Sequence, residues 1–168
     1  MADVPARGDL IPAVFAAALL AVVVSASAEG LTGVRGVSLS VELQHPLDAL
    51  SVEGLLARLE DGVSRAEPPI RVRDDAPNRL RLVVSIRPVS ATVLRGFWLP
   101  FSGTYAIGAV ALEMERRVTA PGIPHSFPAI VWREERAAAG PWPTVDVEIM
   151  RLTDELIAKW LEALRHAP

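Results

Sequence analysis

From residue 37 onward, the pattern of apolar and polar positions changes between the two-residue period of a strand and the longer period of a helix. Apolar and polar residues alternate strictly over residues 37–44, which predicts a strand with one buried face. Residues 48–66 then place apolar side chains three and four positions apart, which predicts a helix with one buried stripe. The stripe consists of Val52, Leu55, Leu56, Leu59 and Val63.

Strand-type alternation returns in the middle of the chain. Residues 70–73 and 79–87 alternate on either side of a turn-forming Asp-Asp-Ala-Pro-Asn segment, so we expect a β-hairpin over residues 70–87. Residues 104–118 predict one long strand and residues 129–136 a shorter one, with a proline-rich loop between them. We expect residues 137–143 to form a linker.

The last segment again has the helix period. Thr144 is a candidate N-cap, and Asp146 and Glu148 suit the positive end of a helix dipole. A long apolar stripe follows, and it consists of Ile149, Leu152, Leu156, Ile157, Trp160, Leu161 and Leu164. This pattern predicts a C-terminal helix with one buried side.

The element order β-α-β-β-β-β-α predicts an α+β fold. Each strand has one apolar face and each helix one apolar stripe, so the stable arrangement is a two-layer sandwich. We expect a mixed, mostly antiparallel sheet of about five strands, with both helices on one face. Residues 29–168 are predicted to form a single domain, preceded by an N-terminal signal helix.

This element order resembles that of small bacterial envelope accessory domains, namely the lipopolysaccharide-assembly lipoproteins and the N-terminal domain of the Tol-system β-propeller protein. The resemblance covers residues 29–168 by element order, and no sequence motif carries it. The chain has no cysteine, whereas a lipoprotein needs one for its lipid anchor. We therefore transfer neither functional residues nor an activity from these families.

The N-terminal segment carries a targeting pattern. Residues 10–24 form an unbroken apolar run, which is shorter than the roughly 20 residues of a membrane span and suits the core of a signal peptide. Ala26-Ser27-Ala28 fits a cleavage site, so we expect residues 1–28 to be a signal peptide and the mature protein to be periplasmic or secreted. The alternative is an uncleaved anchor in the inner membrane over residues 4–28, because Asp3 and Asp9 weaken the positive charge that normally precedes such a core.

Composition narrows the function classes. The absence of cysteine excludes disulfides and thiolate metal sites. The formal net charge is −3, which gives no electrostatic attraction to nucleic acid, so we expect no nucleic-acid partner.

The sequence contains no pattern that indicates catalysis. Ser102 lacks the flanking glycines of a nucleophile elbow, and no Gly-rich phosphate loop is present. His45, His125 and His166 have no second ligand at metal-binding spacing. We therefore expect a non-enzymatic protein without a cofactor or a bound metal. The mixed Glu and Arg residues of 113–117 and 133–136 are best explained as ion pairs across neighbouring strands.

Arginines occupy the outward positions of the expected hairpin. They are Arg71, Arg73, Arg79, Arg81 and Arg87. Two interpretations stay open: a solvated face balanced by nearby carboxylates, or a site for an anionic glycan or lipid. The second would make the protein a small periplasmic ligand-binding protein.

An aromatic-rich stretch precedes the long strand. If its rings fold inward they cap the core, and if they stay outside they form a contact surface. Gly96, Pro100 and Gly103 indicate a loop, and the strand that follows is apolar on both faces near its start. Our hypothesis is a surface for a protein partner or for self-association, made of Phe97, Trp98, Phe101, Tyr105 and Ile107.

Overall fold

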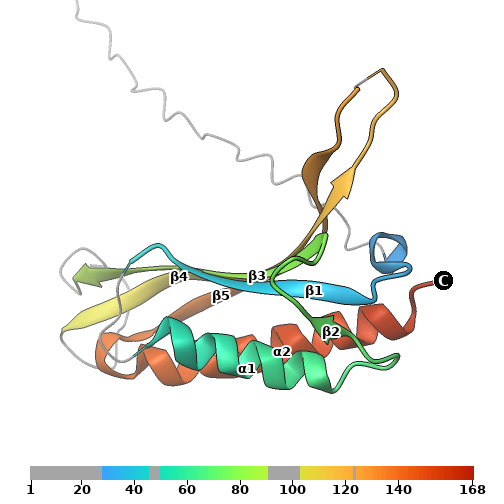
Figure 1. Ribbon diagram of the computed structural model, residues 1–168. Helices are drawn as coiled ribbons and strands as arrows, with labels where there is room; N and C mark the ends of the chain where they lie inside the picture. Colours follow the sequence, from blue (N-terminus) through green and yellow to red (C-terminus); the bar gives the residue numbers. More distant parts are fainter. Residues whose placement is uncertain (1–27, 46–49, 91–102, 123) are drawn as a thin grey trace, which may run out of the picture.

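The computed structural model describes residues 28–45, 50–90, 103–122 and 124–168, and they form two layers (Figure 1). A five-stranded sheet forms one layer, and two helices pack side by side on one of its faces. In chain order the elements are the 3-10 turn η1 (Ala28–Leu31), β1 (Gly36–Leu43), α1 (Val52–Ser64), β2 (Arg71–Val72), β3 (Asn78–Ser90), β4 (Thr104–Val118), β5 (Phe127–Pro141), the 3-10 turn η2 (Trp142–Thr144) and α2 (Val145–Arg165). The predicted α+β class and β-α-β-β-β-β-α order are confirmed, whereas the predicted signal helix lies outside the described residues.

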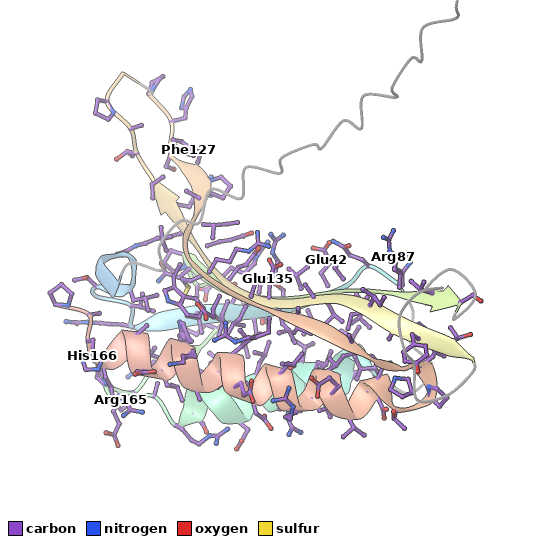
Figure 2. All side chains as sticks on the ribbon, turned by 180° about the vertical axis from the view of Figure 1, so that it is seen from behind. Glu42, Arg87, Phe127, Glu135, Arg165 and His166 are labelled. Carbon is purple, nitrogen blue, oxygen red and sulfur yellow. The ribbon has the colours of Figure 1, made fainter. Side chains whose placement is uncertain are left out.

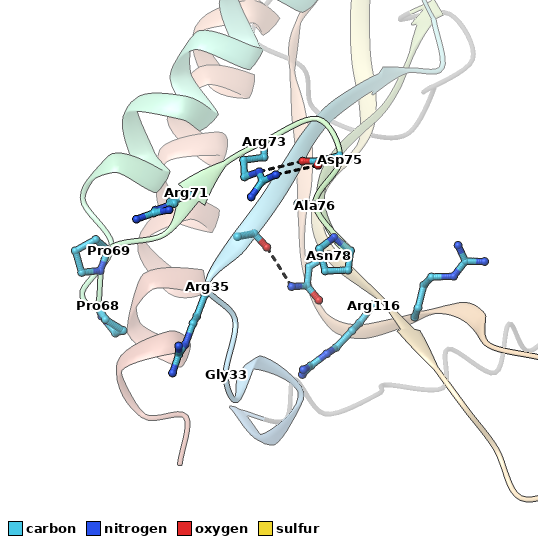
Figure 3. Close-up of a pocket in the computed structure, with 13 residues that line it drawn as sticks. Gly33, Arg35, Pro68, Pro69, Arg71, Arg73, Asp75, Ala76, Asn78 and Arg116 are labelled. Atoms are coloured by element: carbon cyan, nitrogen blue, oxygen red, sulfur yellow. Dashed lines mark hydrogen bonds and ion pairs between the residues drawn. The ribbon is translucent and has the colours of Figure 1, made fainter.

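The sheet has the strand order β2-β1-β3-β4-β5. β1 pairs in parallel with β2 and β3, while β3–β4 and β4–β5 are long antiparallel pairs. The predicted hairpin over residues 70–87 is therefore wrong. β2 and β3 lie on opposite sides of β1, and residues 74–77 carry the chain across β1 from one to the other (Figure 3).

The core lies between the sheet and the helices. Alternate residues of β3 and β4 are buried there, together with both helix stripes, and the fully buried members include Leu55, Leu59, Leu80, Leu82, Leu112, Met114, Ile149, Leu156 and Trp160. Each buried Leu or Ile contributes about 1.5–3 kcal/mol by its removal from water. The helices approach each other closely at Gly62, where a β-carbon would lie 2.6 Å from Cγ2 of Ile157. A bidentate pair between Arg58 and Asp154, with contacts of 2.6 and 2.5 Å, joins the helices at their outer side.

The two helix starts differ from each other. Ser51 caps α1 as expected, because its hydroxyl accepts a hydrogen bond of 2.9 Å from the Gly54 amide. Thr144 stands at the N-cap of α2, but its side chain makes no capping hydrogen bond, and its hydroxyl donates weakly to the Pro141 carbonyl at 3.4 Å.

β4 and β5 extend beyond the sheet as a projecting arm, which we define as residues 116–122 and 124–130. Figure 1 shows the arm rising from the sheet on the side opposite the helices. A β-bulge between Met114 and Glu115 lies at its base, and bulges bend the strands in which they occur. Phe127 and Ile130 are exposed on the arm. At its other end β5 continues to Pro141, so the predicted linker 137–143 is mostly strand.

No helix within the described ranges combines the length and the apolar character that a membrane-spanning helix requires.

Candidate functional site

Among the described residues no helix packs on the other face of the sheet, which we call the open face. It is formed by the residues of β1, β3, β4 and β5 that alternate with the core residues. Figure 2 shows Glu42, Arg87 and Glu135 on this side, opposite the helices. The open face has two parts of different chemistry, one charged and one apolar.

The charged part, which we call the ladder, is a set of ion pairs between residues that stand opposite each other on neighbouring strands. The register places Arg79 opposite Glu115, and Glu113 between Arg81 and Arg133. Arg81 lies 2.6 Å from Glu113, 3.3 Å from Glu115 and 3.5 Å from Glu42, and Arg133 lies 3.3 Å from Glu113. Of the pairing expected between residues 113–117 and 133–136, the Glu113–Arg133 pair joins the two strands, whereas Arg133–Glu135 and Arg136–Glu134 lie within β5.

Glu113 is the most buried charged group of the ladder. Only 4% of its side chain is exposed, and both of its carboxylate oxygens contact arginines. The side-chain hydrogen bond to Glu113 raises the pKa of Arg81, against partial burial, which lowers it. Every cation of the ladder has a carboxylate partner, so this part of the open face stabilises the sheet and leaves little unpaired charge for a ligand.

The apolar part lies near the start of β4 and the end of β5, away from the projecting arm. It consists of Ile107, Ala109, Ala111, Ala137 and Ala139, which the β4–β5 register places side by side. Ile107 is 36% exposed. Ala137 and Ala139 are also exposed, whereas Ala109 is half-buried and Ala111 is buried.

Two residues of the predicted aromatic contact surface are described, and they differ in exposure. Tyr105 is only 7% exposed, whereas Ile107 lies at the surface of the open face. Phe97, Trp98 and Phe101 lie outside the described residues. The prediction for those three aromatics therefore stays a prediction.

The five arginines that we grouped from the expected hairpin do not lie together. Arg79 and Arg81 belong to the ladder. Arg87 lies at the opposite end of β3, beside a shallow hollow formed with His45 and Ile107. Arg71 and Arg73 lie at the β2 edge of the sheet, where they meet arginines that the sequence pattern did not group with them.

These residues line a groove of about 990 Å³ at the start of β1, which we call the arginine groove (Figure 3). Its arginines come from four segments: the lead-in to β1, β2, the crossing segment after β2, and the end of β4. They are Arg35, Arg71, Arg73, Arg116 and Arg117. Pro68, Pro69 and Pro77 supply rigid apolar wall, and Asp75 is the one carboxylate among the lining residues.

Hydrogen bonds fix the frame of the groove. The Arg71 amide donates to the Arg35 carbonyl at 3.1 Å, and the Asn78 side chain donates to the Gly36 carbonyl at 3.1 Å. Arg116 Nη1 donates to the Thr32 carbonyl at 3.0 Å, and Arg73 forms a bidentate pair with Asp75 at 3.0 and 2.9 Å. The groove is thus built by backbone and side-chain contacts between segments far apart in the sequence.

Arg35, Arg116 and Arg117 were missed because the sequence pattern offered no reason to place them together. Arg116 and Arg117 are adjacent at the end of the long strand, which is a weak local signal. Their meeting with Arg71 depends on the crossing of β1, which cannot be deduced from local alternation. Within the described ranges, no three His, Asp or Glu side chains are grouped so as to hold a metal ion.

Comparison with known proteins gives little further information. No family model matches the chain, and no curated protein matches it in sequence. A solved structure of a hypothetical protein from Chlamydia trachomatis is 7% identical, with a TM-score of 0.48 over 79% of this chain and 99% of that one. A minor lipoprotein from Acinetobacter baumannii is 12% identical, with a TM-score of 0.30 over 75% of this chain and 94% of that one. At these identities and TM-scores the likenesses say nothing about what this chain binds.

Proposed function

We propose that this protein is a non-enzymatic accessory domain of the bacterial cell envelope that binds a protein partner on the apolar part of its open face. The observation that carries the proposal is the chemistry of β4 and β5 on this face. A solvated face of an antiparallel sheet normally alternates to polar residues, but here Ile107, Ala109, Ala137 and Ala139 take those positions.

The setting of this surface supports a partner interface. Contiguous exposed apolar residues mark interaction sites more often than scattered ones do. The ladder borders the patch, and charged groups beside an apolar centre favour one partner and one orientation. The sequence places the predicted contact residues Phe97, Trp98 and Phe101 directly before β4, and Tyr105 within it.

The N-terminal pattern supports the location. Residues 10–24 and the Ala-Ser-Ala segment after them are typical of an export signal, so we place the domain in the periplasm or outside the cell. If the segment is not cleaved, the same domain is held at the inner membrane.

Site-specific photocrosslinking tests this function. A photoreactive residue replaces Ile107 in the full chain, and a matched variant carries it at Val147, which is 67% exposed on α2. We expect an adduct between the Ile107 variant and a distinct envelope protein, and its loss when Ala137→Arg places a charge on the patch. Thermal unfolding confirms that each variant is folded.

Two results would contradict the proposal. Adducts at position 107 that are no stronger than those at position 147 would mean that the patch has no partner. An adduct only with a second copy of the chain would replace the proposed partner with self-association.

A further inference from the structure

The arginine groove concentrates positive charge in a chain whose formal net charge is −3. Five arginines and one carboxylate, that of Asp75, are among its lining residues. Asp75 already accepts two hydrogen bonds from the Arg73 guanidinium group. Among the described residues, Arg35, Arg71 and Arg117 make no ion pair, and Arg116 contacts only a backbone carbonyl. Four guanidinium groups in one groove therefore have no anionic partner in the described part of the chain.

This arrangement differs from ordinary surface charge. In the ladder the fold provides a carboxylate opposite each arginine, and Arg81 alone has three within 3.5 Å. Like charges gathered in a concave site with low-dielectric walls raise the local concentration of an oppositely charged ligand. Binding of an anion would relieve the repulsion among the arginines.

We propose that the arginine groove binds a phosphate-bearing ligand with at least two phosphate charges. Guanidinium groups match phosphate oxygens through paired hydrogen bonds, which are stronger than bonds between neutral groups. The volume of about 990 Å³ exceeds what a single inorganic anion fills, and the groove therefore has room for the organic part of the ligand beside Pro68, Pro69 and Pro77. The site goes beyond the proposed function, because it lies apart from the apolar patch and uses other residues.

The position of the groove suggests two sources for such phosphates. Arg116 and Arg117 lie where β4 enters the projecting arm, whose exposed residues include Phe127 (Figure 2). A phosphate carried on a membrane lipid would bring the arm to the lipid surface, whereas a soluble phosphate compound would occupy the groove alone. The same guanidinium groups recognise both.

Two binding experiments on the folded protein separate the sources. Calorimetric titration with pyrophosphate tests soluble phosphate, and flotation with phosphatidylcholine vesicles that contain phosphatidic acid tests lipid-borne phosphate, with pure phosphatidylcholine as the blank. Each uses the wild type and an Arg35→Gln/Arg71→Gln double variant. The matched control is Arg87→Gln/Arg165→Gln, which removes the same charge from two exposed arginines outside the groove.

We expect saturable binding of pyrophosphate, of phosphatidic-acid vesicles, or of both. The groove variant should weaken the binding at least about tenfold, because each charge-assisted hydrogen bond lost is a sizeable fraction of the binding energy. The control variant should bind within about twofold of the wild type, as long-range charge alone is screened at 0.15 M salt. Phosphate binding that the control variant weakens as much as the groove variant would overturn the proposal, as would no binding of either probe by the wild type.

The outcome is independent of the partner interface. Failure of phosphate binding leaves the crosslink at position 107 unaffected, and failure of the crosslink leaves the phosphate titration unaffected. Thermal unfolding of the groove variant, whose two substituted residues are exposed, confirms that lost binding does not reflect lost folding.

Discussion

The ladder and the arginine groove both gather arginines, but they differ in how those arginines are paired. In the ladder, strand register sets a glutamate opposite each arginine, and Glu113 is buried between two of them. In the groove, the arginines come from segments that meet through the crossing of β1, and within the described part of the chain only Arg73 has a carboxylate partner. Charge that neighbours on the sheet neutralise stabilises the fold, whereas charge that the fold gathers without partners is available to a ligand.

The largest expected difference concerns one carboxylate from each region, Glu113 in the ladder and Asp75 in the groove. Glu113→Gln removes the buried charge between Arg81 and Arg133 at nearly constant size, and it should lower the free energy of unfolding by about 2 kcal/mol. Asp75→Asn removes an exposed carboxylate and should cost less than about 1 kcal/mol. Urea unfolding of both variants measures the two effects, and equal losses would contradict the distinction.

Charge reversal should have opposite signs in the two regions. Arg133→Glu places a glutamate directly opposite Glu113 and next to Glu135, so we expect a loss of about 1 kcal/mol in unfolding free energy. Arg71→Glu introduces a carboxylate among unpaired arginines and should leave stability unchanged or raise it by a few tenths of a kcal/mol. Denaturant unfolding at low salt decides the matter, and a clear loss in Arg71→Glu would show that Arg71 already has a stabilising role.

The smallest effect is the repulsion within the groove itself. Arg35→Gln/Arg71→Gln should raise the melting temperature slightly at low ionic strength, since fewer like charges remain. The gain should fade as salt rises, because the screening length is about 10 Å at 0.1 M and about 3 Å at 1 M. Thermal unfolding in a sodium chloride series measures this gain. A variant that is less stable than the wild type at every salt concentration is incompatible with unrelieved repulsion.

The element order was predictable because it rests on local periodicity. The alternation over residues 37–44 and the stripes of both helices reflect one-sided burial, which the structure contains. The ladder was predictable in outline for the same reason, because adjacent strands with mixed charges commonly pair them. The open face follows from two helices and five strands, since two helices cover one face of such a sheet.

The incorrect predictions concern strand pairing. Alternation in residues 70–87 identifies strands correctly but does not say that β1 lies between them. Residues 137–140 have an alanine-rich composition with little strand preference, and their strand conformation comes from pairing with β4. The arginine groove depends on both features of the topology, the crossing after β2 and the long β4, so no local pattern indicates it.

The most direct test of the central claim is the exchange rate of arginine Nε–Hε protons, followed by NMR with and without pyrophosphate. In the free protein, we expect slow exchange for Arg81 and Arg73, whose Nε atoms donate to Glu113 at 3.1 Å and Asp75 at 3.0 Å. We expect fast exchange for Arg35 and Arg71, and slower exchange for both when pyrophosphate is added. Slow exchange of Arg35 and Arg71 before pyrophosphate is added would contradict the claim that these arginines are unpaired and bind an anion. An exchange rate that pyrophosphate leaves unchanged would contradict it as well.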